Sequence, residues 1–215
     1  AILFLVRWAD NKGSRTRKLV AFGSSPFVLL GFYAFFSTLD DVSVKGVYFS
    51  FFSSLLIWSW FEIAFLTGLL TGPNTIASPV EIKGYTRFKL ALGAVAYSEV
   101  ALFITFITLF FMSAGEKNLF GFLTFFVLYL ARLSAKINLF LGVPKINSEF
   151  LPGAIAHLRS HFRTSQTNRF FPVSVLGLVF LFLVWFNNLS TEGANTHQVI
   201  GFMLLCTLTS LAVLE

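Results

Sequence analysis

The sequence predicts an all-α fold: a polytopic integral membrane bundle of about seven transmembrane helices. Hydrophobic residues make up 56% of the 215 residues, with 29 phenylalanines, and the mean hydropathy is +0.77. Charged residues make up only 12%, about half the roughly 25% that is typical of a soluble domain. A phenylalanine-rich soluble core would need a polar surface that this composition does not provide.

Six stretches are long and apolar enough to cross a hydrocarbon layer of about 30 Å, which takes about 20 residues. They are residues 19–38, 47–70, 90–113, 119–143, 171–189 and 197–215. The opening AILFLVRW, residues 1–8, resembles the end of a further helix that is only partly present. We therefore expect a single transmembrane domain over residues 1–215, truncated at both ends.

The basic residues alternate between the connecting segments. Twelve of the 16 lysine and arginine residues lie in residues 7–18, 71–89 and 144–170. The intervening loops hold only Lys45 and Lys117. Cytoplasmic loops of membrane proteins are enriched in these residues, so the pattern predicts that loops 9–18, 71–89 and 144–170 face the cytoplasm. The net charge of +6 then follows from topology, and no nucleic-acid partner is expected.

Few residues suggest a catalytic or metal centre. Cys206 is the single cysteine, and His157, His161 and His197 lie outside the predicted membrane cores, so axial ligation of a pigment by this chain is not expected. In AHLRSHFR the first two histidines are four residues apart, which in an α-helix places them on one face, a spacing that can bind a metal. A basic amphipathic helix at the membrane surface explains this segment more simply.

Ionisable groups inside the predicted spans form the most informative pattern. They are Glu62, Glu99, Arg132, Lys136 and, at the end of the chain, Glu215, and Asn138 lies close by. At 1.5 Å per residue, the first four lie about 10–17 Å from the same membrane boundary. A charge at mid-membrane costs about 2.5–3.5 kcal/mol, so such groups pair or line a cavity. We expect an ion-pair network that joins three helices.

Two other interpretations of these charges stay open. Lys136 could extend alone to the membrane interface, because a long aliphatic side chain can carry its charge to water. The groups could instead form a proton or ion pathway, although the balanced charges disfavour that. A transporter is ranked last, because no broken helix is visible in the sequence, and TGPN at 71–74 is interpreted as a simple helix stop.

Several stretches, in order along the chain, carry a resemblance to one family. They are WSWFEIAFLTGLLTGPN at 58–74, YSEVAL at 97–102, LYLARLSAKINLFLGVPKINSEFLP at 128–152, HLRSHFR at 157–163 and NRFFPVSV at 168–175. Together they resemble PuhE, a family of photosynthetic-complex assembly proteins of anoxygenic phototrophic bacteria. The resemblance implies a multi-pass protein of the inner, intracytoplasmic photosynthetic membrane.

The chain departs from the pattern that this resemblance implies. The family pattern has a histidine before each membrane glutamate and a Glu-His pair in the last helix. Here Phe61 precedes Glu62, Ser98 precedes Glu99, and the sequence stops at Glu215. Paired glutamate and histidine would suggest a metal site, which these substitutions weaken, whereas ion pairing needs only the glutamates.

The resemblance implies a non-catalytic assembly or accessory subunit of the reaction centre and its light-harvesting 1 antenna. Expected partners are the polypeptides of those complexes and membrane lipids. No cofactor of its own is expected; bacteriochlorophyll, carotenoid or lipid would be contacted where partners carry them. The alternative is a membrane metalloenzyme, or an accessory subunit of one, in bacteriochlorophyll or carotenoid supply, with its metal at Glu62 and Glu99.

Two kinds of surface are candidates for contact with partners. Loop 144–170 is the longest of the predicted cytoplasmic loops, and its polar residues are expected to dock a partner: Lys145, Asn147, Glu149, His157, His161 and Arg163. Within the membrane, helices associate through small residues, so Gly23, Ser24, Gly31, Ser53 and Ser54 are further candidates. Trp58 and Trp60 are expected to face lipid or a partner.

Overall fold

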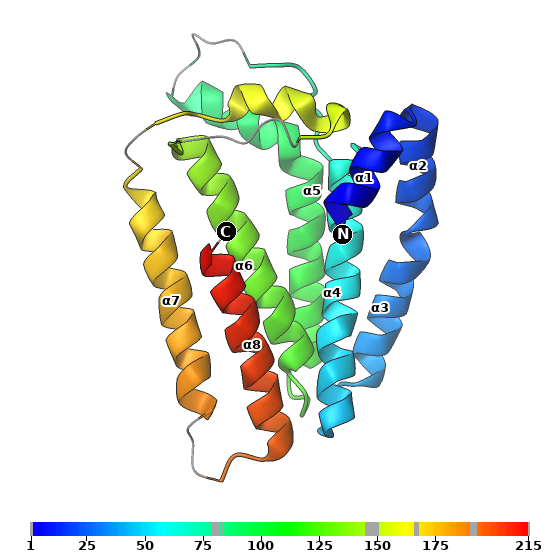
Figure 1. The fold of residues 1–215 in the computed structure, drawn as a ribbon, viewed down its shortest axis with the longest axis vertical. Helices are drawn as coiled ribbons and strands as arrows, with labels where there is room; N and C mark the ends of the chain where they lie inside the picture. Colours follow the sequence, from blue (N-terminus) through cyan, green and yellow to red (C-terminus); the bar gives the residue numbers. More distant parts are fainter. Residues whose placement is uncertain are drawn as a thin grey trace. The chain divides into compact units, whose positions relative to one another are not determined.

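Six helices are long and apolar enough to cross a membrane (Figure 1). The computed structural model describes residues 2–78, 82, 84–144, 151–165, 168–189 and 193–214. Its helices are α1 (Ile2–Asn11), α2 (Ser14–Gly23), α3 (Ser25–Ser37), α4 (Val44–Leu66), α5 (Gly84–Ser113), α6 (Phe120–Leu141), the 3₁₀ helix η2 (Gly153–His161), α7 (Phe170–Leu189) and α8 (Thr196–Leu214). The predicted all-α class and six of the expected spans are confirmed.

The first span is made of two helices. α2 and α3 follow each other with a break at Ser24, and together they form a 24-residue candidate span, Ser14–Ser37. α1 has 10 residues and is about 15 Å long, half the thickness of the hydrocarbon layer. The seventh span therefore stays a prediction.

The chain divides into two compact units. Unit 1 comprises residues 1–27, 59–104 and 136–168, and unit 2 comprises residues 28–58, 105–135 and 169–215. Four helices, α3 to α6, contribute residues to both units, so each unit draws on helix segments far apart in sequence.

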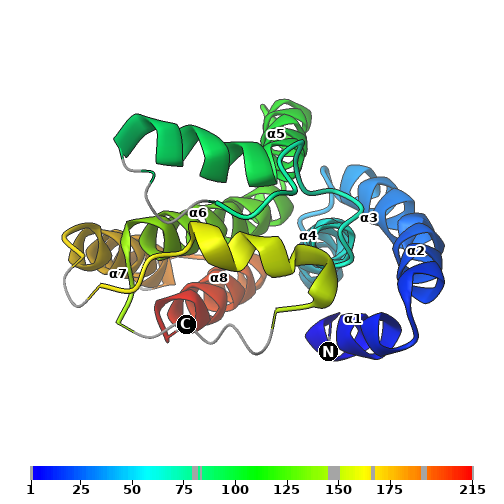
Figure 2. The ribbon, with the colours of Figure 1, turned by 90° about the horizontal axis from the view of Figure 1, so that it is seen from above.

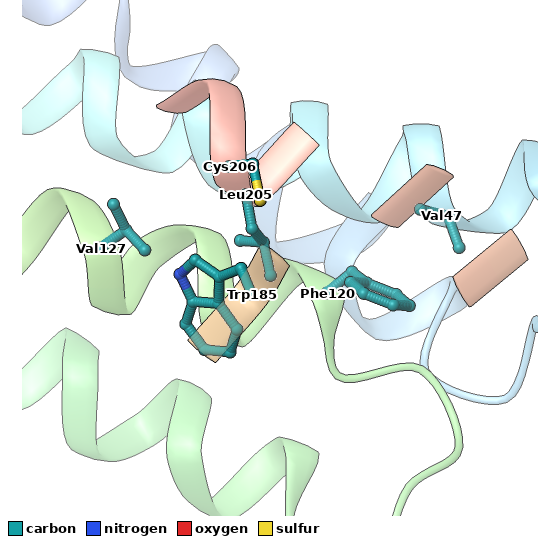
Figure 3. Close-up of a cluster of buried hydrophobic side chains, with 6 residues drawn as sticks. All are labelled: Val47, Phe120, Val127, Trp185, Leu205 and Cys206. Carbon is teal, nitrogen blue, oxygen red and sulfur yellow. The ribbon is translucent and has the colours of Figure 1, made fainter. Parts of the chain in front are cut away.

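The core of unit 2 is a cluster of aromatic and aliphatic side chains (Figure 3). It contains Val47, Phe120, Val127, Trp185, Leu205 and Cys206, which come from α4, α6, α7 and α8. α7 packs against α8, and the rings of Trp185 and Phe202 stack with their centroids 6.2 Å apart. Dispersion contacts of this kind hold helices together where the surrounding lipid is equally apolar.

Small residues let α3, α4 and α6 approach one another closely in unit 2. The hydroxyl of Ser54 donates to the carbonyl of Gly121 at 2.7 Å. A Cβ at Gly31 would lie 2.8 Å from Ile57 and 3.0 Å from the carbonyl oxygen of Ser53. Such close approaches are typical of membrane helix pairs. Gly31, Ser53 and Ser54 are thus packed inside the chain, and their expected role as a partner-binding face is wrong.

α5 bends sharply within unit 1 (Figures 1 and 2). In a regular helix the carbonyl of Gly93 would accept from Tyr97, and the amide of Ser98 would donate to Ala94. Here both groups bind another segment: the amide of Asn74 donates to the Gly93 carbonyl at 3.2 Å, and the Ser98 amide donates to the carbonyl of Thr71 at 3.0 Å. A segment inserted into the hydrogen-bond ladder is a recognised cause of helix kinks.

The inserted segment is TGPN, residues 71–74. The side chain of Asn74 adds a third bond, donating to the carbonyl of Leu90 at 3.0 Å. A Cβ at Gly72 would lie 2.1 Å from the Gly93 carbonyl oxygen, so only glycine allows this approach. The interpretation of TGPN as a simple helix stop is therefore corrected, because these residues also contact α5.

A second surface segment completes unit 1. Ile155 and Leu158 of η2 pack with Phe65 of α4 and Ala94 of α5 in a buried apolar cluster. Asp10 of α1 accepts from the backbone amide of Gly153 at 2.7 Å and from Arg17 at 2.6 Å. One carboxylate thus ties the start of η2 to the α1–α2 pair.

We predict that Gly72→Ala destabilises the protein strongly. The added methyl group would overlap backbone atoms, and overpacking typically costs about 1–3 kcal/mol. The melting temperature in detergent should fall, together with the amount of protein recovered from membranes. Gly177→Ala on α7 is the matched control, because nothing lies within 4 Å of its added Cβ, and it should be neutral or slightly stabilising. Equal melting temperatures for the two variants would contradict the inserted-segment account.

Candidate functional site

An ion pair joins α5 and α6 in unit 1. The ammonium group of Lys136 donates to Oε1 of Glu99. The Lys136 and Glu99 side chains are 23% and 18% exposed, so both charges are largely withdrawn from solvent. The same ammonium lies 4.4 Å from the ring centroid of Phe65 on α4, within the range of a cation–π contact. Three helices of unit 1 therefore converge on one lysine.

The bend of α5 positions the acidic partner. Ser98, directly before Glu99, is buried and gives its amide to Thr71. That bond fixes the rotation of α5 at this residue, and so fixes the direction in which the next side chain leaves the helix. Phe65 carries no sequence signal of its own, because a phenylalanine in a membrane span is unremarkable until a cation is found over its ring.

Glu62 lies on the same side of α4 as Phe65. The two are three residues apart, so they share a helix face, and the Glu62 side chain is partly buried. Glu62 thus belongs to the face of α4 that Lys136 contacts. The expected pairing of Glu62 within a network stays a prediction.

In unit 2, Arg132 contacts an aromatic pair. Its guanidinium carbon lies 5.8 Å from the centroid of the Trp58 ring. Trp58 in turn packs edge-on against Phe125, with centroids 5.4 Å apart. Trp58 thus packs in part within the chain, and because it stays partly exposed, its expected contact with lipid or a partner stays a prediction. A half-buried guanidinium over an indole is favoured by the charge distribution of the ring.

Asn138 is held by a residue that the sequence did not single out. The side-chain amide of Asn168 donates to Oδ1 of Asn138 at 2.8 Å, and Asn138 is 8% exposed. This bond links the end of α6 to the segment just before α7. An asparagine 30 positions away gives no pattern that periodicity could reveal.

The chemistry available at the Lys136–Glu99 pair is charge neutralisation. The carboxylate and the ammonium each satisfy the other, as groups in hydrocarbon must. Among the residues that the structure describes, no three His, Cys, Asp or Glu side chains gather in a group that could hold a metal ion.

The two histidines of η2 lie in different surroundings. A 3₁₀ helix has three residues per turn, so residues three apart stack and residues four apart do not. His161 therefore lies under Leu158 and is 3% exposed, whereas His157 is only partly buried. The α-helical spacing expected to place both on one face does not apply here.

Burial lowers the pKa of both histidines below the ordinary value of about 6.5. For His161, the nearby charges of His157 and Arg87 lower the pKa further, and the backbone of Ile76 partly opposes them. The neutral imidazole is thus the form that suits this site.

The predicted docking loop is only partly available to a partner. Within it, residues 151–165 bury Ile155 and Leu158. Of the predicted docking residues, Lys145, Asn147 and Glu149 lie outside the described residues, as does Glu215 of the predicted network. Arg163 is exposed, His157 is partly buried and His161 is 3% exposed, so the expectation that His161 docks a partner is corrected.

Comparison with known proteins identifies relatives over the full length. A family model described as "Protein of unknown function (DUF3623)" matches residues 1–215. A protein of Rhodobacter capsulatus, described as "Uncharacterized 30.4 kDa protein in puhA 5'region", is 40% identical over 215 residues, which is 100% of this chain and 78% of that protein. No solved structure matches the chain.

We predict that Lys136→Met destabilises the protein more than the loss of an exposed ion pair does. It leaves the Glu99 carboxylate without its cation, and a hydrogen bond to a charged group is worth about 1.5–3 kcal/mol. Lys117→Met is the control, because its 3.4 Å contact with Asp40 is largely exposed and such pairs contribute about 0.2–1 kcal/mol. Thermal unfolding in nanodiscs measures both.

The double variant Glu99→Gln/Lys136→Met extends this experiment. Removing both charges should recover part of the stability that each single variant loses, because no unpaired charge remains. If the loss of stability in the double variant equals the sum of the losses in the two single variants, the two groups do not interact.

We also predict that stability falls on acidification below about pH 6.5. Because the histidine pKa is lower in the folded state, the unfolded chain binds protons at a higher pH than the folded chain does. The contribution to stability is therefore fully present above the unfolded pKa and declines as the pH drops toward the folded pKa. His161→Leu should flatten this decline. Melting temperatures from pH 5 to 8 measure it, and a parent profile without slope in this window would contradict the assignment.

Proposed function

This chain belongs to the DUF3623 family along its whole length, and we propose that it has a non-catalytic role in building photosynthetic membranes. The proposed activity is to assist assembly of the reaction centre and its light-harvesting 1 antenna, as an assembly factor or accessory subunit. The first support is the Rhodobacter capsulatus relative, whose description places it in the region 5′ to puhA, a photosynthesis gene. Genes that lie together in bacteria often serve one process.

The observation that carries the structural side of this proposal is the Lys136–Glu99 pair. A reactive or transporting centre needs a group whose charge can change or whose ligand can exchange. Here a cation from α6 meets a carboxylate from α5 above an aromatic ring of α4. Because the two charges neutralise each other, the pair is better suited to a rigid structural role than to catalysis or transport.

The residues beside the membrane glutamates agree with that role. Phe61 and Ser98 stand where the family resemblance implies histidines, and both side chains are buried. Neither supplies an imidazole to a neighbouring carboxylate. The absence of an imidazole at these two positions is what a structural role would allow.

Contacts with partners would use surfaces that the fold leaves exposed. Arg159 and Arg163 are exposed on segment 151–165 of unit 1 and would meet acidic groups of a partner at the membrane surface. Exposed aromatic residues on the spans, such as Phe103 and Phe180, would meet lipid, partner helices or the pigments those helices carry. Any bacteriochlorophyll or carotenoid contact would come through such partners.

We predict that deleting the gene in a phototrophic bacterium lowers the amount of reaction centre and core antenna in its membranes. Near-infrared absorption of isolated membranes measures both complexes, and a copy of the parent gene should restore them. A copy carrying Lys136→Met should restore less, because destabilisation of about 1–2 kcal/mol changes cellular abundance several-fold. A copy carrying Lys117→Met is the matched control. Unchanged absorption after deletion would refute the proposal.

A further inference from the structure

α5 is longer than a membrane crossing requires. Its 30 residues would measure about 45 Å as a straight helix, against about 30 Å of hydrocarbon. The surplus corresponds to roughly ten residues at the same rise. The bend lies at Gly93–Ser98, where residues 71–74 enter the helix ladder. The segment before the bend, Gly84–Gly93, which we name the α5 arm, therefore has the length of the surplus.

The arm has two different faces. Tyr85, Phe88 and Leu92 follow the spacing i, i+3 and i+7 of one helix face, and they are 79%, 47% and 46% exposed. The opposite face carries Arg87 and Leu90, which are partly buried, and leads to the fully buried Ala94. This apolar stripe is thus about half exposed or more along its length, although the ring of Phe88 also packs edge-on against Phe140 of α6, with centroids 5.8 Å apart.

Arg87 fixes which face points inward. Its guanidinium donates to the carbonyls of Phe140 at 2.8 Å and His161 at 2.9 Å. It also lies 4.3 Å from the ring centroid of Phe140. The arm is therefore bound to the end of α6 and to η2, and cannot turn its apolar stripe into the core without breaking these contacts.

We propose that the α5 arm lies along the membrane surface and that its stripe of Tyr85, Phe88 and Leu92 binds the lipid headgroup–acyl boundary. Tyrosine is enriched at that depth. Lys89, exposed beside the stripe, can bury its aliphatic stem and reach the phosphates. An apolar face flanked by cations, on a helix that does not cross, is typical of interfacial helices. The occupant is thus lipid, and the inference is independent of the proposed function.

Spin-label depth measurements distinguish an interfacial arm from a crossing one. The full chain, in a Cys206→Ser background, would be placed in nanodiscs of phosphatidylcholine and phosphatidylglycerol. Single labels are introduced through Tyr85→Cys, Phe88→Cys and Leu92→Cys. Relative accessibility to oxygen and to a water-soluble nickel chelate reports depth. We expect the three labels at one shallow depth, whereas a helix crossing along the membrane normal would separate the first and last by about 10 Å.

α7 supplies the matched control, because Leu176 and Leu183 are seven residues apart and both exposed to the surroundings of the chain. Labels through Leu176→Cys and Leu183→Cys should differ in depth by about 10 Å. If Leu92→Cys prevents folding, Lys89→Cys replaces it, with a separation from residue 85 of about 6 Å expected for a crossing helix. A depth gradient in the arm equal to that in α7 would overturn the proposal. The proposal would also be overturned if the labels on the stripe were accessible to the nickel chelate rather than to oxygen, or to neither reagent.

Discussion

A polar backbone group inside hydrocarbon has no water to bind and must find its partner within the protein. In unit 1 this constraint decides the course of α5. At its bend, residues 71–74 hydrogen-bond to the carbonyl of Gly93 and to the amide of Ser98. A backbone group left unsatisfied in hydrocarbon costs several kcal/mol. The segment 71–74 therefore supplies partners at the point where α5 changes direction.

The same constraint applies, more strongly, to charges. Lys136 and Glu99 neutralise each other, and Glu99 follows directly on the residue whose amide is held by Thr71. The backbone contacts of the bend thus fix the direction of the Glu99 carboxylate. That carboxylate in turn fixes the position of the Lys136 ammonium group on α6. Rigidity here comes from two layers of bonds, one between backbones and one between side chains. That organisation suits a protein that holds other polypeptides in place.

The sequence predicted the parts of this structure that depend on composition along the chain. Hydropathy located six spans because burial in lipid acts on every residue of a helix. Helix depth placed Glu99 and Lys136 at the same level because the rise per residue is constant. The contacts of Phe65 with Lys136, and of Asn168 with Asn138, were not predicted, since they join residues far apart through tertiary packing.

Other differences arose where a local pattern has more than one structural meaning. TGPN is typical of a helix end, and α4 does end before it at Leu66. Nothing in those four letters shows that they return to contact another helix. The spacing of His157 and His161 suggested one shared face, but that holds only for 3.6 residues per turn, and η2 has three. Serine and glycine on α3 and α4 indicated close helix contact correctly, although the partner is α4 or α6 of the same chain.

The bend of α5 is supported by bonds from outside the helix. Residues 71–74 form three hydrogen bonds with it, one of them from the Asn74 side chain to Leu90. These bonds require close contact between two backbones, and therefore glycine at position 72. Because of the bend, one continuous helix lies in two environments, with Glu99 after the bend and Tyr85 before it. Two separate helices would need a connecting loop, whose own backbone groups would need partners at the edge of the membrane.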